Sequence, residues 1–298
     1  MGFDVVTFGS AVVDAFINTD LSERGNFISY PVGSKILIKD LKFDVGGGGT
    51  NTAVAFSRLG LKTGCICKIG DDEQGNDILS LLKKEKISFL GKQEKNAKSG
   101  YSVILDSKQK NRTILTYKGV NNEIELKDIK RFKTKWIYLT SLLGKSFDSQ
   151  KKLAIKLKRK GIKIAFNPSD YLIKEKDLDF LLKLTDVLIL NKEEAKMLVG
   201  KEGNLLEKLH ELTKGIVVIT DKNKLISCYD GKGIYNLVPN NINVVERTGA
   251  GDAFASGFVA GQIAGLSIQR SLELGLKESE SVIKYFGAKN NLIKMRLK

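Results

Sequence analysis

Apolar residues occur along this chain in short runs that alternate with longer amphipathic stretches. Short apolar runs predict buried strands, and apolar positions that recur every three or four residues predict helices. The predicted strands lie at 4–10, 63–70, 136–140, 163–167, 186–191 and 216–220. The predicted helices lie at 51–59, 73–85, 148–159, 192–199 and 203–213. This alternation indicates an α/β fold with a doubly wound, mostly parallel sheet flanked by helices.

Two stretches interrupt the alternation and predict additional β structure. One follows the first strand and has β-rich runs at 16–18, 28–30 and 35–38. The other spans 99–119, where two β-rich runs flank residues 107–111, and this pattern predicts a hairpin. We expect the insertions at about 14–38 and 99–119 to form a small β lid on a single catalytic domain of residues 1–298. Two further helices are predicted near the end of the chain, at 251–264 and 268–286.

Composition and charge narrow the class of protein. Lys and Arg number 49 against 34 Asp and Glu, which gives a net charge of +15. The basic residues are spread over the polar faces of predicted helices without interleaved aromatics, so we expect attraction of an anionic metabolite and no nucleic-acid binding. No apolar run approaches the ~18 residues of a membrane span, and the N-terminus lacks a signal-peptide pattern, so no membrane contact is expected. Three cysteines and a single histidine predict buried structural thiols in a cytoplasmic protein.

A glycine-rich segment, Gly46–Asn51, precedes the first predicted helix. Its four consecutive glycines remove every Cβ atom, so a ligand can approach the backbone closely. The helix start presents free N–H groups, and the Asn51 amide can both donate to and accept from a hydroxyl-rich ligand. The alternative interpretation is a flexible turn in which Asn51 merely begins the helix.

A second segment of small residues, Thr248–Phe254 (TGAGDAF), begins a later helix. Such a turn forms an anion pocket from backbone amides. Asp252 falls in the first turn, where a carboxylate beside developing negative charge makes sense as the base that deprotonates an attacking hydroxyl. The alternative is an acidic residue that only stabilises the helix dipole.

A third polar segment follows the predicted strand at 186–191. Ligands of open α/β sheets collect beyond the carboxyl ends of strands, where Asn191 and Glu194 could order a hydrated Mg²⁺ beside phosphates. Taken alone, this segment is better explained as a helix N-cap followed by acidic residues in the first turn.

The three segments, in this order and at these separations, resemble the ribokinase family, also called the PfkB carbohydrate kinases. The resemblance runs from Asp4 to about Ala288. It implies a ribokinase-like fold and transfer of the γ-phosphate of ATP to a hydroxyl group, usually a hydroxymethyl, of a sugar. It also implies Mg²⁺ and often a monovalent cation. The alternatives are a nucleoside kinase of the same fold and a non-catalytic homologue that binds nucleotide or sugar.

The resemblance also assigns roles to individual residues. Asp252 is expected to be the catalytic base, beside an anion hole of Gly249, Ala250 and Gly251. The expected substrate-binding residues are Asp14, Gly46, Gly47 and Asn51. The expected nucleotide-binding residues are Asn191, Glu194, Thr220, Lys222 and Thr248. Among these, Glu194 is expected to hold Mg²⁺ together with Asn191, through water.

The sequence departs from the family pattern at three places. Glu246 and Arg247 replace the usual Asp-Thr pair, which predicts a weakened monovalent-cation site at Glu246 and an added positive charge at Arg247. The usual TxGxxG segment has no glycine after Thr220, although Lys222 remains available for phosphate. Glu278 stands where an Asn near the adenine is common.

The predicted lid also suggests an assembly. Val103 and Leu105 are alternate residues of a predicted lid strand and leave apolar side chains on the face away from the substrate. Exposed apolar sheets are usually interfaces, so we expect a homodimer joined through the lids.

Overall fold

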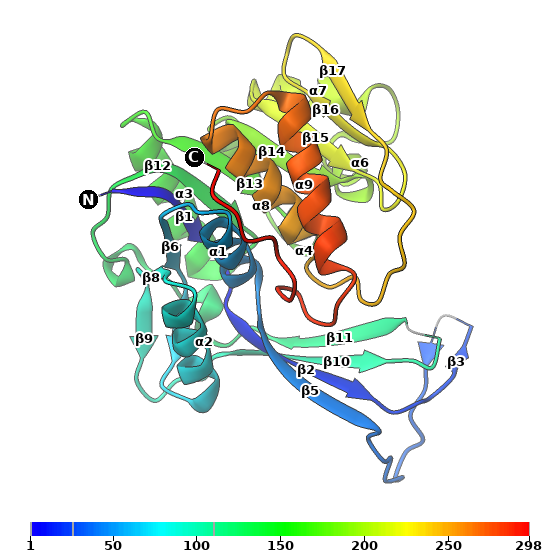
Figure 1. The fold of residues 1–298 in the computed structure, drawn as a ribbon. Coiled ribbons are helices and arrows are strands. Elements are labelled where there is room, and N and C mark those ends of the chain that lie inside the picture. The colour runs from blue at the N-terminus through cyan, green and yellow to red at the C-terminus, as the bar shows by residue number, and fades with distance from the viewer. Residues whose placement is uncertain (1, 26, 110, 298) are drawn as a thin grey trace.

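The computed structural model describes residues 2–25, 27–109 and 111–297. The described residues form a nine-stranded sheet in the order β17-β16-β15-β14-β13-β12-β1-β6-β8 (Figure 1). Its strands are β1 (Phe3–Phe8), β6 (Thr63–Ile66), β8 (Ser88–Phe89), β12 (Thr134–Thr140), β13 (Lys163–Asn167), β14 (Val187–Asn191), β15 (Ile216–Thr220), β16 (Ile226–Tyr229) and β17 (Ile234–Leu237). All neighbouring strands are parallel except at β15–β16 and β16–β17, which confirms the predicted α/β sheet.

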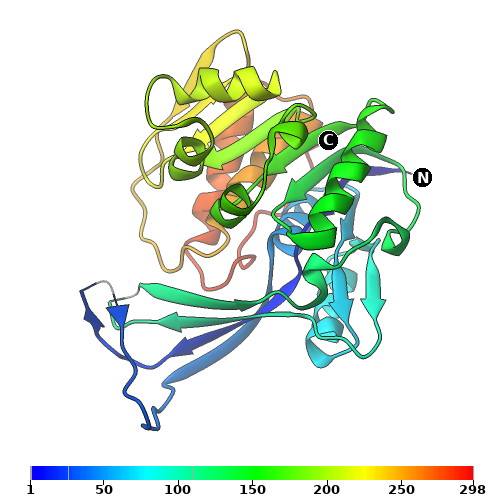
Figure 2. The ribbon, with the colours of Figure 1, turned by 180° about the vertical axis from the view of Figure 1, so that it is seen from behind.

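Helices cover both faces of this sheet (Figures 1 and 2). One apolar core lies beneath α1 (Gly48–Arg58), α8 (Ala250–Ile263) and α9 (Ile268–Val282), with α2 (Glu73–Lys84) beside them. The opposite core lies beneath α3 (Gly144–Lys158), α4 (Asp170–Glu175), α5 (Asp179–Leu182), α6 (Lys192–Val199) and α7 (Leu205–Thr213). The sequence did not predict α4 and α5, because one or two turns are too short to show a helical period.

Strands in the middle of the sheet are buried on both faces, as their continuous apolar runs require. Val187 to Leu190 of β14 are all at most 3% exposed. The three cysteines, at positions 65, 67 and 228, are buried and free, so their structural interpretation is confirmed. No helix of the described ranges is long and apolar enough to cross a membrane.

A second sheet lies beyond the carboxyl end of β1 and forms the lid (Figure 1). Its order is β11-β10-β2-β5, with a short β3–β4 hairpin (Glu23–Arg24 and Phe27–Ile28) near its far end. The predicted hairpin at 99–119 is present as β10 (Gly100–Asp106) and β11 (Arg112–Tyr117), which pair antiparallel. Lys110, in its predicted turn, lies outside the described residues.

The other lid insertion reaches further than the sequence predicts. Its strands are β2 (Val12–Asn18) and β5 (Asp40–Gly46), whereas residues 35–38 form no strand. The predicted boundary at residue 38 is therefore wrong. Charged residues alternate with apolar ones in β5, so the segment lacks the apolar run that marks a buried strand.

Candidate active site

Helix α8 begins at the glycine-rich turn that the sequence marks as an anion pocket. Its N-cap residue, Gly249, has a φ angle of 79°, a left-handed conformation that favours glycine. A Cβ atom at Gly249 would lie 2.6 Å from the backbone oxygen of Ala288, so the position has no room for a side chain. A Cβ atom at Gly251 would meet nothing within 4 Å, which means that the backbone there faces open space. The first turn of α8 can therefore present its free N–H groups to an anion.

Asp252 stands in this first turn, and a side chain of α1 reaches it. Nδ2 of Asn51 donates to Oδ2 of Asp252 over 2.8 Å. Oδ1 of the same amide accepts from Nζ of Lys289 over 3.0 Å. Burial raises the pKa of Asp252 above its usual range, while the Asn51 hydrogen bond and the Lys289 charge act in the opposite direction. A desolvated carboxylate held in this way is suited to accept a proton.

Asp14 lies on β2, directly opposite Asp44 of β5 and Ser102 of β10. It is 8% exposed, and burial raises its pKa, which the hydrogen bond with Ser102 partly offsets. A Cβ atom at Gly46 would lie 1.9 Å from Oδ2 of Asp14, so this glycine makes room for the carboxylate. Gly47 is the N-cap of α1. The structure thus brings together Asp14 and both predicted glycines.

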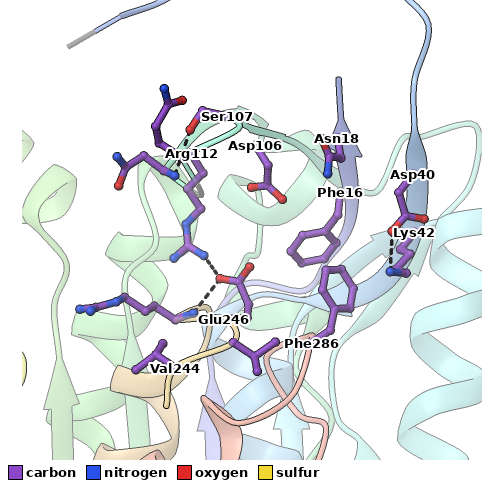
Figure 3. A pocket seen from close by; sticks show the side chains of 14 residues that line it. Phe16, Asn18, Asp40, Lys42, Asp106, Ser107, Arg112, Val244, Glu246 and Phe286 are labelled. Carbon is purple, nitrogen blue, oxygen red and sulfur yellow. Dashed lines mark hydrogen bonds and ion pairs between the residues drawn. The ribbon is translucent and has the colours of Figure 1, made fainter. Parts of the chain in front are cut away.

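A cavity of about 800 Å³ lies between the lid and the loop that precedes α8 (Figure 3). Phe16 and Phe286 form one wall, with ring centroids 4.5 Å apart in an edge-to-face contact. Phe16 is two residues beyond Asp14 on the same face of β2, so that carboxylate lies next to the cavity wall along the strand. The polar lining comes from the lid and the loop: Asn18, Asp40, Lys42, Asp106, Ser107, Gln109, Asn111, Arg112, Glu246 and Arg247.

Glu246 joins the lid to this loop. Its Oε1 atom accepts from the backbone N–H of Arg247 over 2.7 Å and from the Thr248 hydroxyl over 2.8 Å. Arg112, at the start of β11, donates from Nη1 to Glu246 (Figure 3) and also to the Thr248 hydroxyl. A guanidinium thus sits against the carboxylate that the sequence places at the monovalent-cation site.

A second cavity, of about 570 Å³, lies on the other side of the α8 N-terminus. Its lining includes the predicted nucleotide residues Asn191, Thr220 and Lys222, together with Ala250 and Gly251. Val244 and Arg247 line both cavities. The two cavities therefore share the loop at 244–247, a few residues before α8 begins at Ala250.

The loop after β15 keeps a glycine-like backbone without the glycines. Lys222 has a φ angle of 52°, in the left-handed region. Its neighbour Asp221 forms an ion pair with Lys192 over 2.9 Å, which anchors the loop to α6. The side chain of Lys222 lines the second cavity, as expected for a phosphate contact.

Asn191 and Glu194 form a reciprocal capping box at the start of α6. Oδ1 of Asn191 accepts from the Glu194 N–H over 2.9 Å, and Oε2 of Glu194 accepts from the Asn191 N–H over 2.7 Å. Burial raises the pKa of Glu194 to about 7. Within the described ranges, no group of three or more His, Cys, Asp or Glu side chains is placed to hold a metal ion.

Glu278 does not take the place that the sequence suggests. It is fully buried, and its Oε2 atom accepts from the backbone N–H of Ile293 over 3.1 Å. The residues of α9 that line the second cavity are Leu276, Ser279 and Glu280. The expected position of Glu278 near the adenine is wrong, because its side chain points into the protein and not into the second cavity.

Two site residues escaped the sequence analysis, Lys289 and Arg112. Each is one of 49 basic residues and stands in no glycine-rich or strand-end motif. Their contacts, with Asn51 and with Glu246, span 238 and 134 positions of the chain. No local pattern of residues encodes contacts at such separations.

Comparisons with known proteins agree with this geometry. The family model described as pfkB family carbohydrate kinase matches residues 3–295. An uncharacterized sugar kinase of Archaeoglobus fulgidus is 30% identical over 251 residues, 80% of this chain and 98% of that protein. The crystal structure of adenosine kinase from Sinorhizobium meliloti superposes with a TM-score of 0.83 at 21% identity, covering 97% of this chain and 96% of that one. A ribokinase from Cryptococcus neoformans in complex with ADP gives a TM-score of 0.78 at 23% identity, over 100% and 98% of the two chains.

Proposed function

As a member of the pfkB family of carbohydrate kinases, this chain is an ATP-dependent sugar kinase, and we propose that Asp252 is its catalytic base. The single observation that supports this assignment most strongly is the place of Asp252. It stands in the first turn of α8, directly after Ala250 and Gly251, which line the second cavity. We assign this second cavity to the nucleotide and the larger cavity, across the loop at 244–247, to the acceptor.

The transfer step follows from this placement. The acceptor hydroxyl gives its proton to Asp252 while its oxygen attacks the γ-phosphorus of ATP. The bond from that phosphorus to the oxygen shared with the β-phosphate breaks, and its electron pair leaves with ADP. Gly249, Ala250 and Gly251 form the anion hole, because N–H groups at the start of α8 face the charge that develops on the γ-phosphoryl oxygens. Thr220 and Lys222 hold the nucleotide from the end of β15 and the loop after it, and Thr248 holds it from the turn before α8.

Substrate hydroxyls bind beside Asp14, two residues before the cavity residue Phe16 on β2, and beside Asn51, the partner of Asp252. Gly46 and Gly47 let the substrate approach the backbone. Asn191 and Glu194 would hold Mg²⁺ through water, a mode that suits an ion which keeps several of its waters. Mg²⁺, when bound, neutralises charge on the phosphates of ATP. Because Glu246 is already paired with Arg112, activation by K⁺ should stay below tenfold.

One observation favours a second acceptor class. The Phe16–Phe286 wall offers an apolar surface on which a nucleobase can pack, with Asp14 placed for the ribose hydroxyls. A nucleoside is therefore the alternative acceptor.

A coupled assay across sugars and nucleosides, with the D252N variant in parallel, tests the proposal. Asn keeps the shape of Asp252 but removes the base, so turnover should fall by about 10²–10⁴ with little change in KM. Asp77→Asn, at an exposed position of α2, is the matched control and should leave turnover unchanged. A D252N enzyme with near wild-type turnover contradicts the assignment, and the preferred acceptor decides between sugar and nucleoside.

A further inference from the structure

Lys289 is a buried cation beside the proposed base. It lies in the segment after α9 and is 3% exposed. Burial lowers the pKa of its ammonium, while the negative charges of Asp44, Asp14 and Asp252 oppose that effect. These carboxylates come from β5, β2 and α8, so the lysine stands where three elements of the site converge.

The backbone of Lys289 is fixed from the other side. Nη1 of Arg58 donates to the backbone oxygen of Lys289 over 2.7 Å. The same guanidinium is anchored by Glu85, to which its Nε donates over 3.0 Å. The Arg58 charge also faces the ammonium and acts to lower its pKa. Lys289 therefore cannot leave the site without breaking these partly buried hydrogen bonds.

The ammonium dictates the orientation of a catalytic-site amide. An ammonium can only donate, so the oxygen of the Asn51 amide must face Lys289. The nitrogen of that amide then faces Asp252 and donates to it. Reversal of the amide would place its NH₂ group against an ammonium and its oxygen against a carboxylate, two repulsive contacts.

We propose that Lys289 is a positioning residue for phosphoryl transfer: its ammonium fixes the Asn51 amide so that this amide donates to Asp252 and keeps the base ionised and aimed at the acceptor. The proposal rests on the role of Asp252 as the base. Two facts support it besides the hydrogen bonds. Oδ2 of Asp44 is buried with no hydrogen-bond partner among the described residues, so the carboxylate cluster needs a nearby cation. The charge of Lys289 also acts to lower the pKa of both Asp252 and Asp14.

The pH profile of kcat/KM distinguishes this role from a purely structural one. The acid limb of this profile is the fall of kcat/KM as Asp252 becomes protonated at low pH. In Lys289→Met this limb should move to higher pH by roughly one unit, because the Asp252 carboxyl loses a neighbouring opposite charge. The other titratable groups that face Asp252 are Tyr138 of β12 and Tyr171 of α4, whose raised pKa values keep them neutral across this range. We expect kcat at pH 7 to fall roughly tenfold to a hundredfold, with KM for the acceptor changing much less.

Further variants separate charge from hydrogen bond and guard against misfolding. Lys289→Gln keeps a donor to Asn51 without the charge, so its acid limb should also shift while kcat falls less. At a pH above the acid limb, where the base is ionised in every variant, Asn51→Leu combined with Lys289→Met should lose no more turnover than Asn51→Leu alone, because the lysine positions the base through that amide. Lys294→Met, at an exposed position of the same segment, is the matched control and should leave the profile unchanged.

Several results would overturn the proposal. One is an acid limb at the wild-type pH in Lys289→Met or Lys289→Gln. Another is a change in KM or melting temperature with kcat and the pH profile unchanged. The third is a loss of turnover in the double variant that equals the two single losses combined. Asp252→Asn is measured alongside: if it is inactive while Lys289→Met is normal, only the role of Lys289 fails. If Asp252→Asn stays active, the base assignment itself fails.

Discussion

Glu278 shows at the scale of a single residue how burial changes chemistry. Burial raises its pKa to about 7, and its Oε1 atom has no hydrogen-bond partner in the described chain. A carboxyl whose pKa is higher in the folded than in the unfolded state favours folding while it is protonated. That contribution is complete below the unfolded value of about 4.5 and is lost as pH rises through about 7.

We therefore predict that Glu278→Gln removes part of the pH dependence of stability. The measured quantity is the free energy of unfolding of the variant minus that of the wild type. This difference should be more positive at pH 8 than at pH 5, by about 1–3 kcal/mol. Urea unfolding at both pH values measures this difference. Glu273→Gln, at an exposed position of the same helix, is the control and should give no pH-dependent difference. The prediction would be contradicted if the change in relative stability between pH 5 and pH 8 were the same for Glu278→Gln and Glu273→Gln.

At the scale of elements, one side chain couples the lid to the loop before α8. Arg112 of β11 pairs with Glu246 and Thr248, which stand a few residues before the anion hole. Hydrogen bonds to charged groups contribute about 1.5–3 kcal/mol, enough to bias the lid toward its closed position. Closure excludes water from the transfer step.

Replacement of Arg112 by Gln should loosen this contact. We expect KM for the acceptor to rise about tenfold, since 1.4 kcal/mol corresponds to that factor. ATP hydrolysis without acceptor should also increase, because a loosened lid admits water to the phosphate. Steady-state kinetics with and without acceptor measure both effects, and Arg131→Gln, at an exposed position, is the control. Unchanged values for both would show that the lid closes without this pair.

For the whole molecule, the outer face of the lid favours a second copy of the chain. Arg112 lines the acceptor cavity, so Leu115 and Tyr117 lie on the opposite face of β11 and are 55% and 58% exposed. Val103 of β10, which pairs with Leu115, and Phe43 of β5 belong to the same face. An exposed apolar face on a small sheet usually binds a partner, so we propose a homodimer joined through the lids.

Light scattering at micromolar concentration tests the dimer. The wild type should show twice the chain mass of 32.9 kDa. Leu115→Ser should shift the mass toward that of the single chain and lower activity as well. Ile114→Ser is the matched control, because Ile114 is similarly exposed, at 47%, on the cavity face of the same strand. A wild-type mass near 33 kDa, with or without substrate, would contradict the proposal.

The sequence alone determined the parts of this protein that local chemistry specifies. Continuous apolar runs predicted the strands of the parallel sheet, because these strands are buried on both faces. The helical period of the apolar positions predicted most of the helices that cover the sheet. The glycine-rich turns before α1 and α8 predicted both helix starts of the site, since few other residues allow the backbone to come so close. Asp252 could be identified because it stands within such a turn.

Only the tertiary structure decided which distant residues meet in the site. It brought Lys289 to Asn51 and Arg112 to Glu246, and it turned Glu278 away from the nucleotide cavity. It also assigned β5 to the lid, although the charged residues of that strand conceal it in the sequence. The physical reason is common to these cases. A turn or a helical period is encoded within a few residues, whereas the partner of a buried charge depends on how the packed layers place side chains far apart in the chain.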